Sequence, residues 1–416
     1  MTSRASGAAR ASFVDLARER GFVLYQAARV LSMLGVQMQG VALAWHLYDM
    51  TRDPMSLAFV GLAQFAPQIL LSLVTGLVAD HVDRRRVLGA AHGLVLVAAL
   101  GLFVLARSGS RRVAAIYALS VVVGAARAFG GPAGQALLPT LVPRDLFPTA
   151  VALSSSTWQL AMIVGPSVGG VVLGATGRPE AVYATTAALL AVSIGLVSLV
   201  PRPADAEPTP KRAIRAADVA LGLRYVLSNK PVLGAITLDL FAVLLGGAVA
   251  LLPIFAKDRL GAGPMGLGVL RAAPAIGAAS MAALLAIRPL RRRAGTWLLA
   301  CVFAFGVATI VFGVSTSLPL SVVALAVSGA ADMVSVVVRL TLVQLKTPDE
   351  MRGRVAAVNA VFIGASNELG EFESGLTAAW LGPVAAVVVG GLGTCVVVAL
   401  WAVLFPSLRK IDRLTE

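Results

Sequence analysis

Long apolar segments recur along the whole chain, and each is long enough to cross a bilayer as an α-helix. A membrane-spanning helix needs about 20 predominantly apolar residues. Runs that exclude or nearly exclude charged residues lie at 22–48, 56–80, 87–107, 113–138, 148–175, 180–200, 231–256, 264–288, 296–314, 318–345, 354–380 and 382–405. This pattern predicts an all-α membrane protein with twelve transmembrane helices.

One long polar interruption divides these runs into two sets of six. Residues 201–230 contain four prolines and then a basic amphipathic stretch at 213–227, which indicates a linker that ends in a surface helix. The expected organisation is an N-terminal tail, a first six-helix bundle, a cytoplasmic linker, a second six-helix bundle and a C-terminal tail, at 1–21, 22–200, 201–230, 231–405 and 406–416.

The composition and the charge distribution set the topology. Apolar residues make up 58% of the 416 positions and charged residues 13%, which excludes a chain built mainly of soluble domains. With both termini inside, the cytoplasmic segments carry 24 Lys and Arg residues and the outer loops carry 7. Because cytoplasmic loops of membrane proteins attract Lys and Arg, topology explains the net charge of +14, and no nucleic-acid partner is expected.

The two halves of the sequence resemble each other. At an offset of 205, Gly124-Ala-Ala falls on Gly329-Ala-Ala and Gly165 falls on Gly370. At an offset of 207, the run 84–86 of three arginines falls on 291–293. The alternative is a chance alignment of alanine-rich segments. Repeated halves of six helices are typical of secondary transporters, whose substrate site lies near the bilayer midplane at the repeat interface.

Several motifs resemble one known family. The segment 76–86 reads Gly-Leu-Val-Ala-Asp-His-Val-Asp-Arg-Arg-Arg and is similar to the motif that joins helices 2 and 3 of the major facilitator superfamily. It departs from that motif at His81 and Asp83, where the family usually has a basic residue and Gly. The Asp-Arg-Arg form, together with segments at 127–143, 165–170, 239–255 and 352–355, resembles the branch of enterobactin exporters and macrolide efflux proteins.

The resemblance implies a gate at the cytoplasmic side, built on Gly76, Asp80, Arg84 and Arg85. A glycine lets two helices approach closely in lipid. Asp80 would cap a neighbouring helix and pair with a basic residue near the start of the run at 354–380. The alternative is that Asp80 is an interfacial charge beside Arg84. The second half has Ile287 at the position of Asp80, so such a latch would be one-sided.

A second motif combines a helix breaker with small residues in the fifth predicted helix, at Gly165, Pro166, Gly169 and Gly170. Proline removes a backbone hydrogen bond, so this helix is expected to bend. The family associates the motif with exporters that exchange substrate against protons. Ordinary helix packing is an equal alternative for the glycines.

Four charged residues occupy equivalent positions deep in the predicted helices. Arg29 matches Asp239 at an offset of 210, and Arg127 matches Asp332 at an offset of 205, with opposite sign in each pair. Ionisable residues inside a membrane are costly and are functional candidates by default. In the superfamily the first, fourth, seventh and tenth helices line the central cavity. The resemblance therefore implies a cavity with a basic N-terminal wall and an acidic C-terminal wall.

These charges suggest a coupling mechanism. We expect Asp239 and Asp332 to be proton sites, with Arg29 and Arg127 as their partners or as anchors for an anionic substrate. A structural ion pair is the alternative. Glu368 and Glu371 share one face of the eleventh predicted helix, which suggests a polar path, a cation site or contact with an outer vestibule. Arg271 and Arg339 are possible partners of these acids.

Other classes of function lack their motifs. No lysine follows a glycine, so the phosphate loop of an ATP-driven pump is missing. Three histidines, and two cysteines at 301 and 395 inside apolar runs, predict neither a metal centre nor a disulfide. A membrane enzyme is disfavoured because no nucleophile constellation is present, and a receptor derived from a transporter fold remains a further alternative.

The sequence thus predicts a secondary active exporter in a bacterial cytoplasmic membrane, with both termini in the cytoplasm. The resemblance points to a siderophore or a similar amphipathic small molecule as substrate, with a drug such as a macrolide as the alternative. A proton gradient is the expected driving force, no cofactor or catalytic residue is expected, and the protein is predicted to be a monomer in the bilayer.

Overall fold

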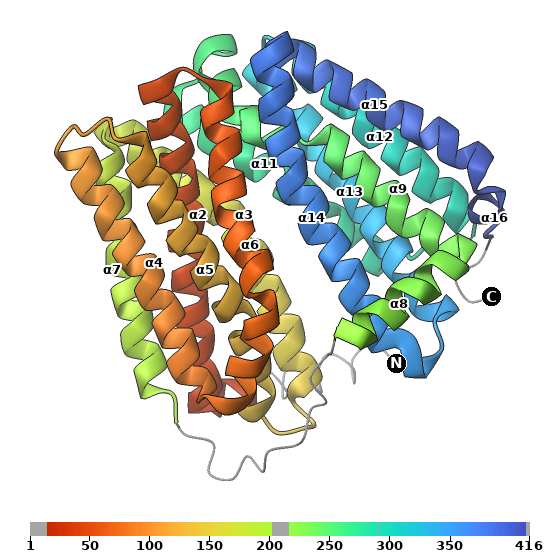
Figure 1. Ribbon diagram of the computed structural model, residues 1–416, viewed down its shortest axis with the longest axis horizontal. Helices are drawn as coiled ribbons and strands as arrows, with labels where there is room; N and C mark the ends of the chain where they lie inside the picture. Colours follow the sequence, from red (N-terminus) through yellow and green to blue (C-terminus); the bar gives the residue numbers. More distant parts are fainter. Residues whose placement is uncertain (1–14, 202–215, 291, 413–416) are drawn as a thin grey trace. The chain divides into compact units, whose positions relative to one another are not determined.

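The computed structural model describes residues 15–201, 216–290 and 292–412 (Figure 1). The long helices of the first half are α2 (Arg20–Thr51), α3 (Pro54–His81), α4 (Arg84–Arg107), α5 (Val113–Leu137), α6 (Phe147–Thr176) and α7 (Pro179–Leu199), with the short η1 (Leu138–Thr140) after α5. No strand occurs within these described ranges.

The second half begins with α8 (Ala216–Ser228) and α9 (Lys230–Gly246), and three short elements follow, η2 (Val249–Leu251), α10 (Leu252–Ile254) and the π-helix η3 (Phe255–Arg259). It continues with α11 (Gly263–Ile287), α12 (Ala294–Val314), α13 (Leu318–Lys346), α14 (Asp349–Leu381), α15 (Pro383–Leu404) and α16 (Pro406–Arg409).

The predicted all-α membrane fold is confirmed. In the described part of the chain, eleven helices are long and apolar enough to cross a membrane. The remaining long helix, α14, has 33 residues and carries acidic and basic residues at its start and glutamates in its middle. With α14 the helices match the twelve predicted runs. The helices begin where sequence chemistry favours a start, because proline stands in the first turn of α6, α7, α9, α11, α13 and α15.

The chain divides into two compact units. The first comprises Met1–His46 and Ala63–Ala213, and the second comprises Leu47–Leu62 and Ile214–Glu416. The end of α2 and the start of α3 therefore belong to the second unit, although the rest of both helices belongs to the first. Residues 1–14 and 202–215, which include most of the predicted N-terminal tail and the first part of the linker, lie outside the described ranges.

The internal repeat reappears in the packing within each unit. Helix α4 packs against α5 and α7, and its counterpart α12 packs against α13 and α15. A Cβ atom placed on Gly165 would lie 3.4 Å from the carbonyl oxygen of Leu34, and one placed on Gly370 would lie 3.1 Å from that of Leu244. Both glycines and both carbonyls are repeat equivalents, at offsets of 205 and 210. The same close helix crossing is thus built twice.

One predicted helix is interrupted. The run at 231–256 was expected to form a single helix, but α9 ends at Gly246 and the chain continues through short helical pieces as far as Arg259. The freed carbonyl group of Gly247 accepts a hydrogen bond of 2.6 Å from Ser374 Oγ of α14. Broken helices are tolerated in membranes when neighbouring side chains satisfy the backbone in this way. Two successive glycines at 246–247 mark the break in the sequence.

Candidate transport site

A cavity of about 670 Å³ lies in the first unit, between α2, α4, α5 and α6. Its wall is mostly apolar, with Tyr25, Phe147 and Trp158 as its aromatic members. The charged side chains on the wall are Arg29 and Arg127, and no Asp or Glu occurs among the described residues that line it. The cavity therefore combines positive charge with an aromatic surface.

Within the described part of the chain, each arginine makes one hydrogen bond, which leaves further donors available. Arg29 is half-buried on α2 and donates from Nη1 to the backbone oxygen of Ser154 on α6, at 3.3 Å. Arg127 on α5 donates from Nη1 to Oε1 of Gln64 on α3, at 3.1 Å. A guanidinium group carries several N–H donors, so each side chain can still bind a carboxylate or a phenolate. Arg and anionic oxygens form strong charge-assisted hydrogen bonds.

The surroundings of Arg29 are fixed by polar contacts between helices. Tyr25 donates a hydrogen bond of 2.9 Å to the backbone oxygen of Gly134 on α5. Gln26 contacts Thr157 on α6, and Ser154 Oγ donates to Oε1 of Gln26 at 3.0 Å. These contacts determine how α2 faces α6 along the cavity wall. The sequence alone could not indicate that Ser154 and Thr157 are the partners of Gln26.

A buried acid-rich cluster lies in the second unit, on α9 and α13. Arg339 Nη1 lies 2.9 Å from Asp239 Oδ2 and donates to Asn359 Oδ1 of α14 at 3.3 Å. Asp239 is 5% exposed and Arg339 is 2% exposed. Asp332 lies seven residues before Arg339 on α13 and interacts electrostatically with both Asp239 and Arg339. We call Asp239, Asp332 and Arg339 the acid cluster.

The acid cluster holds two carboxyl groups and one guanidinium group. Ser335 Oγ, beside these groups, and Nε of the Arg339 guanidinium itself are buried and have no hydrogen-bond partner in the described part of the chain. Ser335 lies between Asp332 and Arg339 on the same face of α13, since residues three or four apart are neighbours on a helix. The cluster is therefore polar and carries more acidic than basic groups; Asp239 and Arg339 are buried, and Asp332 is half-buried.

Asp239 forms its ion pair with Arg339. The sequence analysis had considered Arg339 as a possible partner of the glutamates in the eleventh predicted helix. Arg29 and Arg127 belong to the first unit, and Asp239 and Asp332 belong to the second. The spacing of seven residues between Asp332 and Arg339 was the signal that could have indicated their common helix face.

The remaining predicted site residues differ in what the structure shows of them. Gly76 and the side chains of Asp80 and Glu368 lie outside the part of the structure that is described. Glu371 is half-buried on α14, where a Cβ atom on Gly61 would lie 3.4 Å from its Oε2. Gly165, Pro166, Gly169 and Gly170 are all buried in α6. A Cβ atom on Gly169 would lie 2.8 Å from Cα of Met38, so this motif seats α6 closely against α2.

The arginines of the predicted gate motif tie α4 to its neighbours. Arg84 donates to the backbone oxygen of Ala136 at 3.1 Å, and Arg85 contacts the backbone oxygen of Val200. Arg85 also forms an ion pair of 2.9 Å with Asp83, the N-cap residue of α4. The side-chain hydrogen bond from Arg85 holds the pKa of Asp83 below its usual value. The departure from the family motif at position 83 thus supplies a helix cap and a partner for Arg85.

Known proteins resemble this chain over nearly its whole length. A family model described as transmembrane secretion effector matches residues 11–415. Enterobactin exporters of Shigella boydii and Citrobacter koseri are 28% and 29% identical, and each alignment covers 92% of this chain and 91% of the relative.

Solved structures show the same fold. A bacterial homologue of the iron transporter ferroportin in an inward-facing state has a TM-score of 0.72 at 16% identity, covering 94% of this chain and 99% of the other. A POT family transporter in complex with a thioalcohol-conjugated peptide has a TM-score of 0.74 at 11% identity, covering 94% of this chain and 96% of the other. The chain is a multi-pass inner-membrane transporter, and it belongs to the transmembrane secretion effector family of the major facilitator superfamily.

Proposed function

We propose that the protein is a proton-coupled exporter of a siderophore or a similar amphipathic, anionic small molecule. The observation that carries the proposal is the cavity of the first unit, which presents two arginines and aromatic side chains without an acidic residue on its described wall. Two relatives that are 28% and 29% identical are enterobactin exporters, which supports a substrate of this class.

The chemistry of the cavity selects its ligand by charge and by shape. An amphipathic molecule would bury its apolar rings against Trp158, Tyr25 and Phe147 and would bring its anionic oxygens to Arg29 or Arg127. The charge pair at Arg29 gains more from a low dielectric than the one at Arg127, because Arg29 is half-buried and Arg127 is exposed. A cationic drug would instead be repelled by two guanidinium groups, so the cavity favours the siderophore-like substrate over a cationic macrolide.

Coupling to protons is assigned to the acid cluster. With both acids ionised, two carboxylates and one guanidinium carry a net negative charge in a buried site, and burial of net charge is costly. Binding of one proton makes the cluster neutral. A change in the exposure of Asp239 or Asp332 during transport would therefore load or release one proton.

The proposal includes a topology and an oligomeric state. Both termini lie in the cytoplasm, because that arrangement places 24 Lys and Arg residues inside and 7 outside. Transport then runs through alternating access around a midplane site, as in other transporters with repeated halves. We propose that a monomer suffices, since each chain contains both repeats.

The test of the substrate is uptake of enterobactin into inside-out vesicles that contain the purified protein. Arg29→Gln and Arg127→Gln should each lower uptake roughly tenfold or more, because a hydrogen bond to a charged group contributes about 1.5–3 kcal/mol. Arg178→Gln is the matched control, since Arg178 lies in the turn between α6 and α7, away from the cavity lining. Uptake of a macrolide but not of enterobactin would overturn the substrate class.

The test of coupling uses the same vesicles with an imposed pH gradient. Asp239→Asn and Asp332→Asn should abolish the stimulation of uptake by the gradient, while exchange of substrate down its own gradient continues. Undiminished proton-driven uptake in both variants would refute the assignment of the acid cluster. Asp145→Asn, in the turn between α5 and α6, controls for the loss of a carboxylate elsewhere.

A further inference from the structure

A single histidine interrupts the apolar side that α4 contributes to the cavity of the first unit. The described residues of α4 that line the cavity are Leu88, Ala91, His92 and Val95. Their spacing of three and four positions places them on one face of the helix. His92 is only 8% exposed. A buried polar ring on an otherwise apolar face needs partners for its two nitrogen atoms.

One ring nitrogen of His92 is bound by α7. Nδ1 lies 3.0 Å from Oγ of Ser193, and Ser193 is fully buried. The same hydroxyl donates a hydrogen bond of 2.7 Å to the backbone oxygen of Ala28 on α2. A serine hydroxyl has one proton to donate. Because that proton is directed to Ala28, Oγ of Ser193 accepts from His92, and Nδ1 is the donor.

These two hydrogen bonds determine the tautomer of the ring. In a neutral imidazole one nitrogen carries the proton and the other accepts. With the proton on Nδ1, Nε2 of His92 is an acceptor, and it has no hydrogen-bond partner within the described ranges. Since Nδ1 faces Ser193 and the residue lines the cavity, the ring edge with Nε2 borders the cavity. The neutral form is favoured because a charged ring would add a third buried cation beside Arg29 and Arg127.

The same hydrogen bonds bring this acceptor close to a donor group. Ala28, which receives the hydrogen bond from Ser193, directly precedes Arg29 on α2. Arg29 and His92 both line the cavity. A guanidinium group has donors and no acceptor, whereas Nε2 of His92 offers an acceptor. A ligand that satisfies both side chains therefore carries an anionic oxygen and also a hydroxyl or N–H donor.

We propose that His92 is a specificity-determining residue of the cavity, whose Nε2 accepts a hydrogen bond from a hydroxyl group of the substrate while an arginine binds an anionic oxygen. The inference rests on the proposed function, because it takes this cavity as the substrate site. With the aromatic side chains of the wall, it narrows the substrate class to aromatic anions that carry hydroxyl donors. A ligand of the same shape without the donor leaves a buried acceptor unsatisfied, which disfavours its binding.

Binding of two aromatic acids to the purified protein in nanodiscs tests the proposal. Protocatechuate has a carboxylate and phenolic hydroxyl groups on one ring, and veratrate is the same molecule with both hydroxyls methylated. Isothermal titration calorimetry of the parent chain should give a Kd for protocatechuate about three- to tenfold below that for veratrate, as expected for one neutral hydrogen bond.

Two substitutions of similar size separate hydrogen bonding from shape. His92→Leu removes the acceptor and should bring the two Kd values to within about twofold of each other. His92→Gln places an amide oxygen near the position of Nε2 and should keep most of the preference. An unchanged preference in His92→Leu would overturn the role of His92.

A second measurement reports the tautomer without any ligand. The chain has three histidines, so NMR spectra of isotope-labelled ring nitrogens are simple, and the signals lost in His92→Leu identify those of His92. A protonated Nδ1 and an unprotonated Nε2 are expected. The opposite tautomer, or a ring with protons on both nitrogens, would overturn the proposal. Ser193→Ala removes the partner that fixes Nδ1 and should reduce the preference for protocatechuate.

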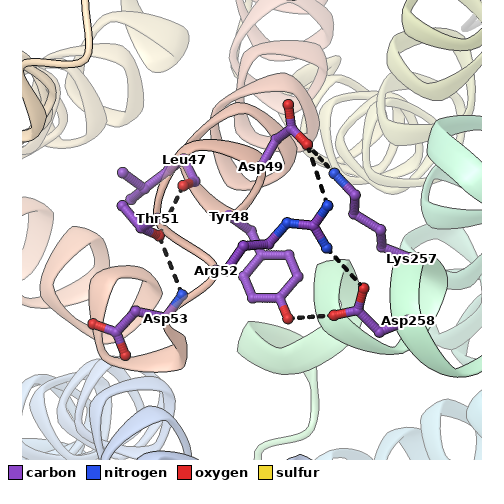
Figure 2. A network of polar contacts seen from close by, with 8 residues as sticks. All are labelled: Leu47, Tyr48, Asp49, Thr51, Arg52, Asp53, Lys257 and Asp258. Carbon is purple, nitrogen blue, oxygen red and sulfur yellow. Dashed lines mark hydrogen bonds and ion pairs between the residues drawn. The ribbon is translucent and has the colours of Figure 1, made fainter.

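Polar groups outside the cavity lining provide the controls. His46 Nδ1 lies 3.3 Å from the Tyr183 hydroxyl. At the turn between α2 and α3, Tyr48 donates to Asp258, which also pairs with Arg52 at 3.0 Å (Figure 2). None of these five is among the described residues that line the cavity. His46→Leu and Tyr48→Phe should therefore change neither Kd by more than about twofold.

A failure of the proposed function gives a different result from a failure of this inference. The double variant Arg29→Gln, Arg127→Gln should weaken the binding of both acids, because both carry the same carboxylate. If the parent chain binds neither acid, or if the double variant binds both as tightly as the parent, the cavity is not the anion site and the proposed function fails as well. Equal affinity of the parent for both acids, with loss in the double variant, overturns the role of His92 alone. Thermal unfolding of each variant verifies that it is folded.

Discussion

At the scale of single residues, the acid cluster depends on Arg339. This side chain is 2% exposed, and it contacts both Asp239 and Asn359. Buried ion pairs contribute little net stability compared with apolar residues, but removal of one partner leaves an uncompensated charge and is strongly destabilising. Arg339 is therefore a structural partner of the two acids as well as a part of the coupling site.

We predict that Arg339→Met lowers the free energy of unfolding by about 3–5 kcal/mol, because it leaves Asp239 and Asp332 without their buried cation. Combining it with Asp239→Asn should recover a large part of this loss. Thermal unfolding of the purified protein in detergent measures both. A single variant as stable as the parent chain would show that Arg339 does not compensate the acids.

Asp83 is a second single residue that contributes to the stability of the fold, and its contribution depends on pH. It caps α4 by accepting from the backbone nitrogen of Arg85 at 3.0 Å, and the Arg85 side chain lowers its pKa. Because the folded pKa is the lower one, the stabilisation is present above the unfolded pKa of about 3.9 and is lost as the pH falls below it.

Asp83→Ala should therefore cost about 1 kcal/mol at neutral pH, which is typical for loss of an N-cap. The difference from the parent chain should shrink as the pH falls below about 4. Asp83→Asn keeps the cap and loses only the ion pair, so its cost should be smaller. Melting temperatures between neutral pH and pH ~3 check the prediction, and a pH-independent difference would contradict the role of the ionised carboxylate.

At the scale of helices, small residues decide how closely elements pack. A Cβ atom on Gly329 of α13 would lie 2.0 Å from the carbonyl oxygen of Pro274 on α11, and one on Gly124 of α5 would lie 2.1 Å from that of Gln64 on α3. Contacts with backbone atoms cannot be relieved by rotating a side chain. Glycine at these crossings is thus required by distance, in agreement with the role of small residues in membrane helix packing.

Gly329→Ala should destabilise the protein by about 1–3 kcal/mol, since overpacking forces α11 and α13 apart. Gly195→Ala is the matched control, because Gly195 lies inside α7 with nothing within 4 Å of an added Cβ. There the substitution should stabilise by up to about 1 kcal/mol through helix propensity. Detergent unfolding curves of the two variants give the comparison, and a neutral Gly329→Ala would contradict the close crossing.

At the scale of the whole molecule, the proposed topology places both termini on one face of the membrane, as an even number of spans requires. We propose that this face is the cytoplasmic one, because the predicted cytoplasmic loops carry most of the Lys and Arg residues. The same assignment puts the turn between α2 and α3 outside and the turn between α3 and α4 inside.

Alkaline phosphatase fused to the C-terminus should consequently be inactive in bacterial cells, while a green fluorescent protein fused there should fluoresce. The reverse pattern is expected for fusions truncated after Arg52. An active phosphatase at the C-terminus would invert the proposed topology.

Much of the architecture was predictable from sequence because it depends on local properties. Lipid thickness requires runs of about 20 apolar residues, so the number and order of the helices follow from the hydrophobic pattern. The helix ends were less predictable: α14 begins at Asp349, five residues before the predicted run, because polar side chains continue the helix beyond the apolar segment. The break after Gly246 could not be predicted without Ser374, which lies 127 residues from Gly247 and donates a hydrogen bond to its freed carbonyl.

The sequence by itself determined the all-α membrane class, the twelve helices, the repeated halves and the charged positions that deserve a functional test. Only the tertiary structure decided which charges meet. Arg339 and Asp239 are separated by 100 positions in the chain, and Arg52 and Asp258 by 206. Their pairing depends on how each helix is rotated and how closely its neighbours approach. The pattern of apolar residues in the sequence does not reveal such pairing, because a helix face that contacts lipid and one that contacts a neighbouring helix are equally apolar.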